Sequence, residues 1–275
     1  MKGKKKDRNL KRKKNIDIDQ KREQRKQYFF VIRELTSREI KRKYSRSYLG
    51  IVWSVLNPLL SMSVLSMIFT QLFRRSIENY PIYYLSGYIL WHMFTTATTA
   101  AMTTLVDNKQ MLIKVRLPME VFVVARVYTA FVNLGYSLVA YVIMLVVFQV
   151  TPKLSMLFFP VVIILLLIFA LGISFFLSTA YVFFGDIKHL YSVLLTLWMY
   201  CSALFYPIDR LEGIIRKIIE INPIFNYIDA LRNIVLNGMI PPYGEIIRMV
   251  LWAVIVFFVG YYVFRKNRNN IMQKL

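Results

Sequence analysis

Side chains able to do acid–base or nucleophilic chemistry are sparse in the apolar parts of this 275-residue sequence. A membrane-embedded catalyst needs a cluster of acids, histidines or thiols. His92 and His189 are the two histidines and Cys201 is the one cysteine, and apolar runs separate them. There is no Cys/His ligand cluster, no glycine-rich phosphate loop and no carboxylate pair at helical spacing within an apolar run. We therefore predict no catalytic residue, no metal site and no cofactor bound by this chain, with Cys201 buried as a small hydrophobe.

Other polar groups do occur within the apolar runs. Arg126 follows Pro118 by about 10 Å of helix, so it can snorkel to the nearer membrane surface or face a polar path; we expect the former. The remaining groups are hydroxyls, an amide and aromatic rings at Asn57, Ser61, Thr95, Thr99, Thr103, Tyr191, Trp198 and Tyr200. They fit close helix packing, and they also fit a path for an uncharged polar chain such as a glycan.

Long apolar runs must position these groups. Of all residues, 57% are apolar or aromatic, which is more than a soluble core of this length buries. About 20 consecutive apolar residues cross a bilayer as a helix. We therefore predict an all-α integral membrane fold with six transmembrane helices, at residues 49–73, 83–105, 119–148, 155–184, 190–206 and 246–264.

Basic residues concentrate before the first apolar run. Residues 1–50 hold 19 of the 36 lysines and arginines beside six acids. We predict that 1–27 is a disordered tail, either solvated or held against anionic lipid. No motif for binding RNA or DNA accompanies this charge, so we expect no nucleic-acid partner. Residues 28–48 have an amphipathic pattern that predicts a helix in the membrane interface.

The start of that interface helix and the orientation of the chain also follow from local patterns. Thr36 and Glu39 have the spacing of a capping box, in which each side chain bonds to the backbone of the other. Cytoplasmic loops are rich in lysine and arginine. The basic N-terminal segment and the basic tail at 265–275 therefore place both ends of the chain in the cytoplasm.

Two connections have helical patterns of their own. The inner connection 106–118 alternates apolar and basic residues, which predicts a short helix parallel to the membrane. The outer segment 208–238 contains two short amphipathic stripes. Asn222-Pro223 caps and begins the second stripe, and Gly238 follows its end. Each stripe is about half a bilayer long, so we expect two re-entrant helices.

Several segments together resemble one membrane-protein family. They are Arg38–Tyr44, Ser47–Pro58, Leu85–Trp91, Lys114–Pro118, Phe183–Ile187 and Asn222–Ile224. In this order they resemble the permease subunit of type-2 ATP-binding-cassette exporters of lipid-linked polysaccharides, the class that moves O-antigen, capsule or teichoic acid. The match runs from about Phe30 to Tyr262. The sequence departs from the family pattern at Gly185, where arginine is common, and in its long basic tail.

The resemblance implies a role for each group of residues. Contact with the ATPase partner would involve Asn108, Lys109, Met111, Leu112, Lys114, Val115, Arg116 and Asp186. The channel entrance, attracting the pyrophosphate of the lipid carrier, would use Arg38, Lys41, Arg42, Lys43 and Arg46. The outer gate would contain Pro207, Asn222, Pro223, Phe225 and Tyr227. The hydroxyl and aromatic residues of the first, second and fifth spans would line the sugar path.

The resemblance also implies partners and a location. The permease would be a homodimer in the bacterial cytoplasmic membrane, bound to two copies of a separate ATPase subunit that holds ATP and magnesium. Its cargo would be a glycan on a polyprenyl pyrophosphate carrier. Three alternatives stay open from the residues: a drug or lipid efflux permease with the same six-helix plan, a membrane enzyme acting on polyprenyl-phosphate lipids, and a receptor or assembly protein without transport activity.

Overall fold

The computed structural model describes residues 2–45, 47–73, 77, 79–114 and 117–275, and their side chains except those of 2–21, 25, 72 and 73. These residues form helices and connections without a strand, as the sequence predicts. The α-helices are α1 Lys2–Tyr44, α2 Trp53–Phe73, α3 Tyr80–Asp107, α4 Lys109–Lys114, α5 Glu120–Val147, α6 Phe159–Phe183, α7 Ile187–Tyr200, α8 Gly213–Ile221, α9 Pro223–Arg232, α10 Tyr243–Lys266 and α11 Arg268–Lys274. Short 3₁₀ turns lie at Gly50–Val52, Leu154–Phe158 and Ile208–Arg210, and a π-helical turn at Asn233–Asn237.

Four helical segments of the described residues are long and apolar enough to cross a membrane. They are Gly50–Gln71, Glu120–Val147, Leu154–Phe183 and Tyr243–Lys266. They coincide with the predicted first, third, fourth and sixth spans. α3 has 28 residues, but six threonines and His92 lower its hydropathy. α7 has 14 residues, or about 21 Å of helix, which is less than the ~30 Å hydrocarbon core.

The predicted fifth span at 190–206 is therefore wrong as one continuous helix. α7 ends at Tyr200, and turns follow from Cys201 onward. The physical reason is contact with a distant part of the chain. Asn222, just before α9, and Arg232 of α9 donate to backbone carbonyls of residues 201–204 and hold them in a non-helical path.

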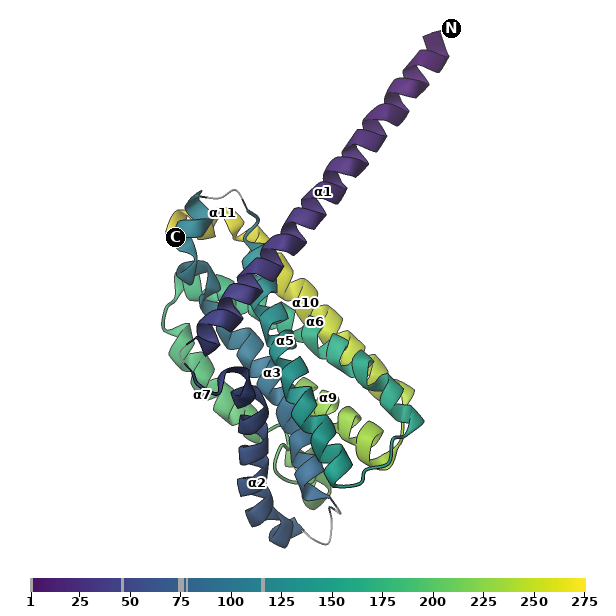
Figure 1. Cartoon of the computed structure of the whole chain (residues 1–275), viewed down its shortest axis with the longest axis vertical. Coiled ribbons are helices and arrows are strands. Elements are labelled where there is room, and N and C mark those ends of the chain that lie inside the picture. The colour runs from purple at the N-terminus through teal and green to yellow at the C-terminus, as the bar shows by residue number, and fades with distance from the viewer. Residues whose placement is uncertain (1, 46, 74–76, 78, 115–116) are drawn as a thin grey trace.

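α3 lies at the centre of the bundle (Figure 1). It packs against α2, α5, α6, α7 and α9, and 17 of its residues are buried. Buried hydroxyls on α3 bond inside the protein: Thr98 Oγ1 donates to the Phe94 carbonyl at 2.9 Å. Because protein surrounds this helix on most sides, its low hydropathy is compatible with membrane depth.

α6 and α10 approach each other most closely at two glycines. A Cβ atom on Gly260 would lie 2.0 Å from the Gly172 carbonyl oxygen, and one on Gly172 would lie 2.5 Å from the Val256 oxygen. Only hydrogen fits at either position. Small residues of this kind let membrane helices pack backbone to backbone, so this crossing fixes the α6–α10 pair.

α1 differs from the predicted N-terminal region. It is one helix from Lys2 that projects from the bundle and packs its C-terminal part against α5 (Figure 1). The predicted disordered tail at 1–27 and the separate helix at 28–48 are therefore both corrected. Lysine, arginine, glutamate and glutamine are strong helix formers, and this segment lacks proline.

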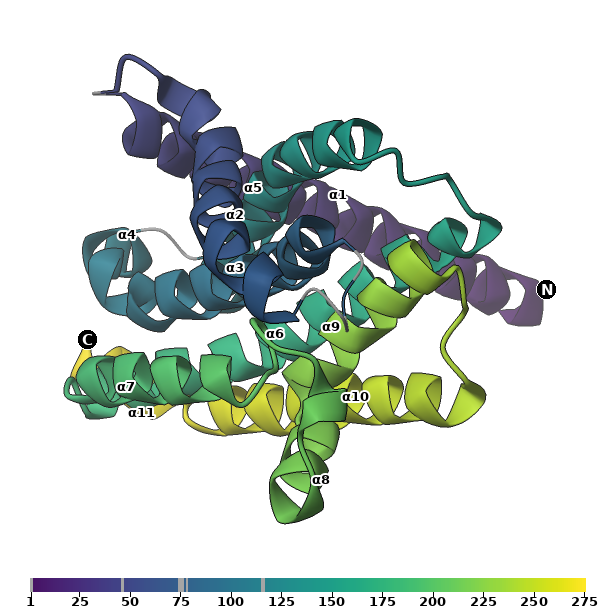
Figure 2. The same cartoon turned by 90° about the horizontal axis from the view of Figure 1, so that it is seen from below.

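The bundle has two ends that carry different short helices. α4 and α11 lie at one end, called the α4 end, and α9 lies toward the other, called the α9 end (Figures 1 and 2). α4 covers Lys109–Lys114, so it is shorter than the predicted 106–118 helix. The tail at 265–275 is largely helical, because α10 runs to Lys266 and α11 follows. The two predicted helices within 208–238 are present as α8 and α9, with Gly238 in the left-handed region at φ +72°.

Candidate functional site

A cleft of about 390 Å³ lies between α1, α3 and α5. We call it the α1 cleft. Its lining includes Arg42 and Lys43 from α1, Thr96 and Thr103 from α3, and Asn133 from α5. The cleft thus joins two residues predicted for the channel entrance with one predicted for the channel wall. Asn133 is buried, and its Oδ1 atom accepts no hydrogen bond from the described residues.

An ion pair joins α1 to α5 beside this cleft. Glu39 Oε2 lies 2.5 Å from Arg126 Nη1, and each side chain is about 10% exposed. Arg126 Nε also donates to Thr104 Oγ1 at 3.2 Å. A buried charge needs such a partner. The expectation that Arg126 snorkels to the membrane surface is therefore wrong, because a carboxylate from α1 neutralises it where it stands.

The same ion pair shows why the capping box was a wrong interpretation. Thr36 and Glu39 lie inside α1 rather than at its start. Thr36 Oγ1 donates to the Ala125 carbonyl at 3.4 Å and accepts from Thr129 Oγ1 at 3.2 Å. Both side chains therefore bond to α5 instead of to the α1 backbone.

A further hydrogen bond connects α1 to the start of α4. Arg38 Nη2 donates to Asn108 Oδ1 at 2.8 Å, and Asn108 Nδ2 donates to the Thr104 carbonyl at 2.8 Å. Thr104 also receives the bond from Arg126, so the two contacts share one residue of α3. The structure thus places Arg38, predicted at the channel entrance, against a residue predicted for contact with the ATPase.

At the α9 end, both polar atoms of the Asn222 side-chain amide make hydrogen bonds. Its Oδ1 accepts from Ile224 N at 3.0 Å, which confirms the predicted cap before Pro223, and from Trp198 Nε1 at 2.8 Å. Its Nδ2 donates to the Cys201 carbonyl at 2.9 Å and to Ser202 Oγ at 3.0 Å. One amide therefore caps α9 and also holds the end of α7.

Arg232 at the other end of α9 holds the same turn. Its guanidinium donates to the Tyr83, Ala203 and Leu204 carbonyls at 3.1, 3.0 and 2.9 Å, and to the Tyr83 hydroxyl at 2.8 Å. It also lies 3.5 Å from the centre of the Tyr83 ring. Arg232 is 4% exposed. With Asn222 it fixes residues 201–204, and we call the two side chains the α9 clamp.

The sequence reasoning missed Arg232. Asp229, Arg232 and Asn233 are three and four residues apart, so they share a face of α9. Arg232 also follows Ile228 by four residues, so it lies at the edge of the apolar stripe of α9, and this position is the signal that the sequence offers. A charged residue in such a stripe is by itself a reason to look for a buried partner.

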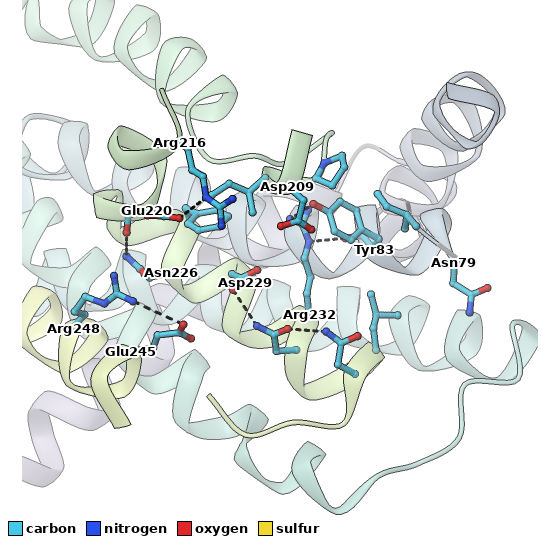
Figure 3. Close-up of a pocket in the computed structure, with 17 residues that line it drawn as sticks. Asn79, Tyr83, Asp209, Arg216, Glu220, Asn226, Asp229, Arg232, Glu245 and Arg248 are labelled. Atoms are coloured by element: carbon cyan, nitrogen blue, oxygen red, sulfur yellow. Dashed lines mark hydrogen bonds and ion pairs between the residues drawn. The ribbon is translucent and has the colours of Figure 1, made fainter. Parts of the chain in front are cut away.

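A second hollow, called the α9 pocket, has a volume of about 630 Å³ (Figure 3). It lies against α9 and receives side chains from α3, the 207–209 segment, α8 and α10. Four carboxylates and three guanidinium groups line it, at Asp209, Glu220, Asp229, Glu245, Arg216, Arg232 and Arg248. Burial raises the pKa of the Asp229 carboxyl, and the nearby Arg232 charge partly opposes this shift.

Comparisons with known proteins identify the family. Residues 31–236 match the ABC-2 type transporter family. The chain belongs to this family. It is 27% identical over 251 residues to the O-antigen export system permease protein RfbA of Myxococcus xanthus, covering 90% of this chain and 96% of the relative. The protein of the same name in Klebsiella pneumoniae is 29% identical, with 90% and 95% covered. The polysialic acid transport protein KpsM of Escherichia coli is 20% identical, with 88% and 95% covered.

The resemblance seen in the sequence is therefore confirmed. The relatives are transport permeases by name, which favours transport over the enzyme alternative. With the four apolar helices, the match identifies this ABC-2 protein as a multi-pass integral membrane protein of the bacterial inner membrane.

The residues predicted for ATPase contact lie largely on the surface of the α4 end. Lys109 and Lys114 are exposed, whereas Leu112 is 5% exposed and packs into the apolar core below α4. Met111 is half-buried, and Asp186 is exposed just before α7. Val115 and Arg116, together with Arg46 of the predicted entrance, lie outside the described residues. The remaining entrance residue, Lys41, is exposed on α1.

The predicted channel residues divide into two groups. Tyr191 and Trp198 serve packing within the subunit: the Tyr191 hydroxyl donates to Thr98 Oγ1 at 2.7 Å, and the Trp198 ring lies 5.4 Å from that of Phe94. The other predicted residues keep some or all of their surface open. Of these, Asn57, Thr99 and Tyr200 are exposed, and Ser61, Thr95 and Thr103 are half-buried.

The predicted gate residues are mostly interior. Tyr227 is fully buried and donates to the Met249 carbonyl at 2.8 Å, while Phe225 and Pro207 are buried near α8. Cys201 is exposed, so its predicted burial is wrong. Its carbonyl, rather than its thiol, is the group that the α9 clamp holds.

Proposed function

We propose that this ABC-2 protein is the permease subunit of an ATP-driven exporter that moves a lipid-linked polysaccharide across the bacterial cytoplasmic membrane. One observation carries the proposal. Relatives named for O-antigen export align with 90% of this chain and with 95–96% of their own length. The shared region therefore includes the α1 cleft, α4 and the α9 pocket, not the membrane helices alone.

A six-span topology with both ends in the cytoplasm suits this function. α3 and α7 with its following turn are the two spans added to the four apolar ones. The α4 end then faces the cytoplasm, and α8 and α9 are re-entrant helices at the outer surface. Exposed isoleucines on α8 support its contact with lipid, at Ile214, Ile215, Ile218 and Ile221.

In this proposal, α4 is the contact for a separate ATPase subunit that holds ATP and magnesium. Leu112 anchors α4 in the core, while Lys109 and Lys114 face outward for a partner. Asn108 links α4 to α1 through Arg38, so a push on α4 would reach the α1 cleft. Asp186 lies in the connection before α7 and would add a second contact.

The α1 cleft is the proposed entrance for cargo. Arg42 and Lys43 supply positive charge for the pyrophosphate of a polyprenyl carrier, because guanidinium and ammonium groups bind phosphate oxygens well. Thr96, Thr103 and Asn133 continue the cleft with groups that bond to sugar hydroxyls. Two copies of the chain would enclose the complete path between them.

A charge reversal at α4 tests this function. We expect Lys109→Glu with Lys114→Glu to abolish co-purification with the ATPase subunit and export of the polymer by cells. Lys217→Glu reverses an equally exposed charge at the α9 end and should change neither. Normal export by the Lys109→Glu/Lys114→Glu protein would remove α4 from the mechanism. Export of polymer by the purified chain without any ATPase would end the proposal itself.

A further inference from the structure

The α9 pocket has no role in the export mechanism described so far. Its volume of about 630 Å³ falls in the range of ~300–1,000 Å³ in which proteins bind small molecules. Figure 3 shows Asp209, Asp229 and Arg232 close together beside α9, with the Arg216–Glu220 and Arg248–Glu245 pairs to one side and Asn79 at the other. The pocket lies at the opposite end of the bundle from α4, where cargo would leave the protein.

The positive groups of this pocket are already occupied. Arg232 directs its donors at three carbonyls and the Tyr83 hydroxyl. Arg216 Nε donates to Glu220 at 2.8 Å, and Arg248 lies 3.9 Å from Glu245. An anionic ligand would have to compete with Glu220 and Glu245 for Arg216 and Arg248, so it is a poorer match for the pocket than a neutral ligand.

The negative groups have free capacity. Asp229 accepts from Asn233 Nδ2 at 3.0 Å, which leaves most of its lone pairs unused. Asp209 makes no hydrogen bond or ion pair with the described residues. The formal charge of the lining is −1, from four carboxylates and three guanidinium groups. A ligand rich in donors is therefore favoured, and the hydroxyls and amines of sugars are such donors.

Aromatic and amide groups complete the lining. Tyr83, which is partly exposed, contributes a ring on which the apolar face of a sugar packs, and Asn79, Asn226 and Asn237 contribute amides. Charged and amide groups make up most of the lining, so the pocket offers many polar contacts that can orient a ligand. Tyr83 accepts a hydrogen bond from Arg232 of the α9 clamp, so a ligand here would lie beside a side chain that holds the end of α7.

We propose that the α9 pocket binds one or two neutral or amino sugar residues of the exported polymer after they have passed through the permease. This site rests on the proposed export function and adds to it an exit subsite with a stated preference against anionic sugars. Because the pocket borders the α9 clamp, a bound sugar would stabilise the present arrangement of α7, α9 and the turn between 201 and 204.

The test uses the full chain in lipid nanodiscs and three trisaccharides of similar size: chitotriose, its deacetylated glucosamine form and trigalacturonate. Saturation-transfer-difference NMR should show binding of the first two and none of the third. Asp209→Asn with Asp229→Asn should weaken that binding by about tenfold, the effect of losing charged acceptors. Glu212→Gln is the matched control, because this exposed carboxylate just before α8 lies outside the lining of the pocket, and the variant should bind as the parent does.

A labelling experiment locates the ligand independently of these acids. In a Cys201→Ser background, the parent has no other thiol, so Asn237→Cys places a single reactive group on the pocket rim. Chitotriose should slow its reaction with a maleimide and leave Ser192→Cys, on the exposed face of α7, unaffected. Equal protection of both sites, or equal binding of trigalacturonate, would overturn the pocket assignment. Cellular export distinguishes the proposed exit subsite from the proposed export function. Export without pocket binding would contradict only the subsite, and pocket binding without export would contradict the export function.

Discussion

Among the side chains that the structure describes, two arginines are buried, and they are stabilised in different ways. Arg126 near the α4 end pairs with one carboxylate, Glu39, at 2.5 Å. Arg232 at the α9 end has no ion pair among the described residues and donates instead to three carbonyls and a hydroxyl. Each arrangement satisfies a guanidinium in a region where a charge without polar partners is costly, but only Arg126 is neutralised by an opposite charge.

The difference bears on which end can move. The Glu39–Arg126 pair and two hydrogen bonds of Thr36 join α1 to α5 through side chains of α1, so α1 can shift against α5 without disturbing a backbone turn. The α9 clamp holds a backbone turn through several bonds that would have to break together. We infer that the α4 end is built to change its arrangement and that the α9 clamp is built to keep the end of α7 in place.

The largest expected effect is at the α9 clamp. Arg232→Leu would leave the Ala203 and Leu204 carbonyls and the Tyr83 hydroxyl without this partner, at roughly 1–3 kcal/mol for each unsatisfied group. We expect a loss of about 4 kcal/mol or more, seen as a sharp fall in the thermal unfolding temperature of the purified protein. Arg248→Leu, at a partly exposed arginine of the same pocket, should cost under about 1 kcal/mol. Similar losses in the two variants would contradict the clamp.

A smaller loss of stability is expected at the Glu39–Arg126 ion pair, and a second substitution should recover most of it. Glu39→Leu leaves the Arg126 charge buried alone and should cost about 3 kcal/mol. The double variant Glu39→Leu/Arg126→Leu removes both charges and should recover most of that loss, because apolar pairs often replace buried ion pairs without penalty. Thermal unfolding of the four proteins gives the coupling energy directly. Additive losses would show that the two side chains act independently.

Local signals in the sequence were sufficient to predict an element where its structure depends on residues close by in the chain. The spans of α5, α6 and α10 follow from apolar length, and Asn222-Pro223 predicts the start of α9 because cap and proline act within one turn. The same local logic failed at Thr36 and Glu39. Their spacing fits a cap, but their partners are on α5, nearly 90 residues away, and tertiary bonds took precedence.

The prediction of the site from the sequence was limited in the same way, because the site depends on contacts between distant parts of the chain. The sequence assigned Arg42 and Lys43 to a predicted entrance and Thr103 to a predicted channel wall. Folding of α1 against α3 and α5 brings the three residues into one cleft. The end of α7 at Tyr200 could not be read from an apolar run that continues to Tyr206. It depends on Asn222 and Arg232, which lie beyond the next helix in the chain. No local pattern encodes a contact of that kind.

The smallest expected effect is the pH dependence of stability that arises from Asp229, which lies near Arg232 of the α9 clamp. Burial raises the pKa of Asp229 above its unfolded value near 4, despite the opposing charge of Arg232. The folded state therefore binds a proton more tightly than the unfolded state does. Stability from this group is fully present below the unfolded pKa and is lost as pH rises through the folded pKa. Asp229→Asn removes the titration, so its unfolding temperature relative to the parent should increase from pH 4 to pH 7. A constant difference over that range would show that Asp229 is hydrated like an ordinary surface carboxylate. Water would then reach the α9 end, which would contradict the inference that the α9 clamp is the more rigid of the two arginine sites.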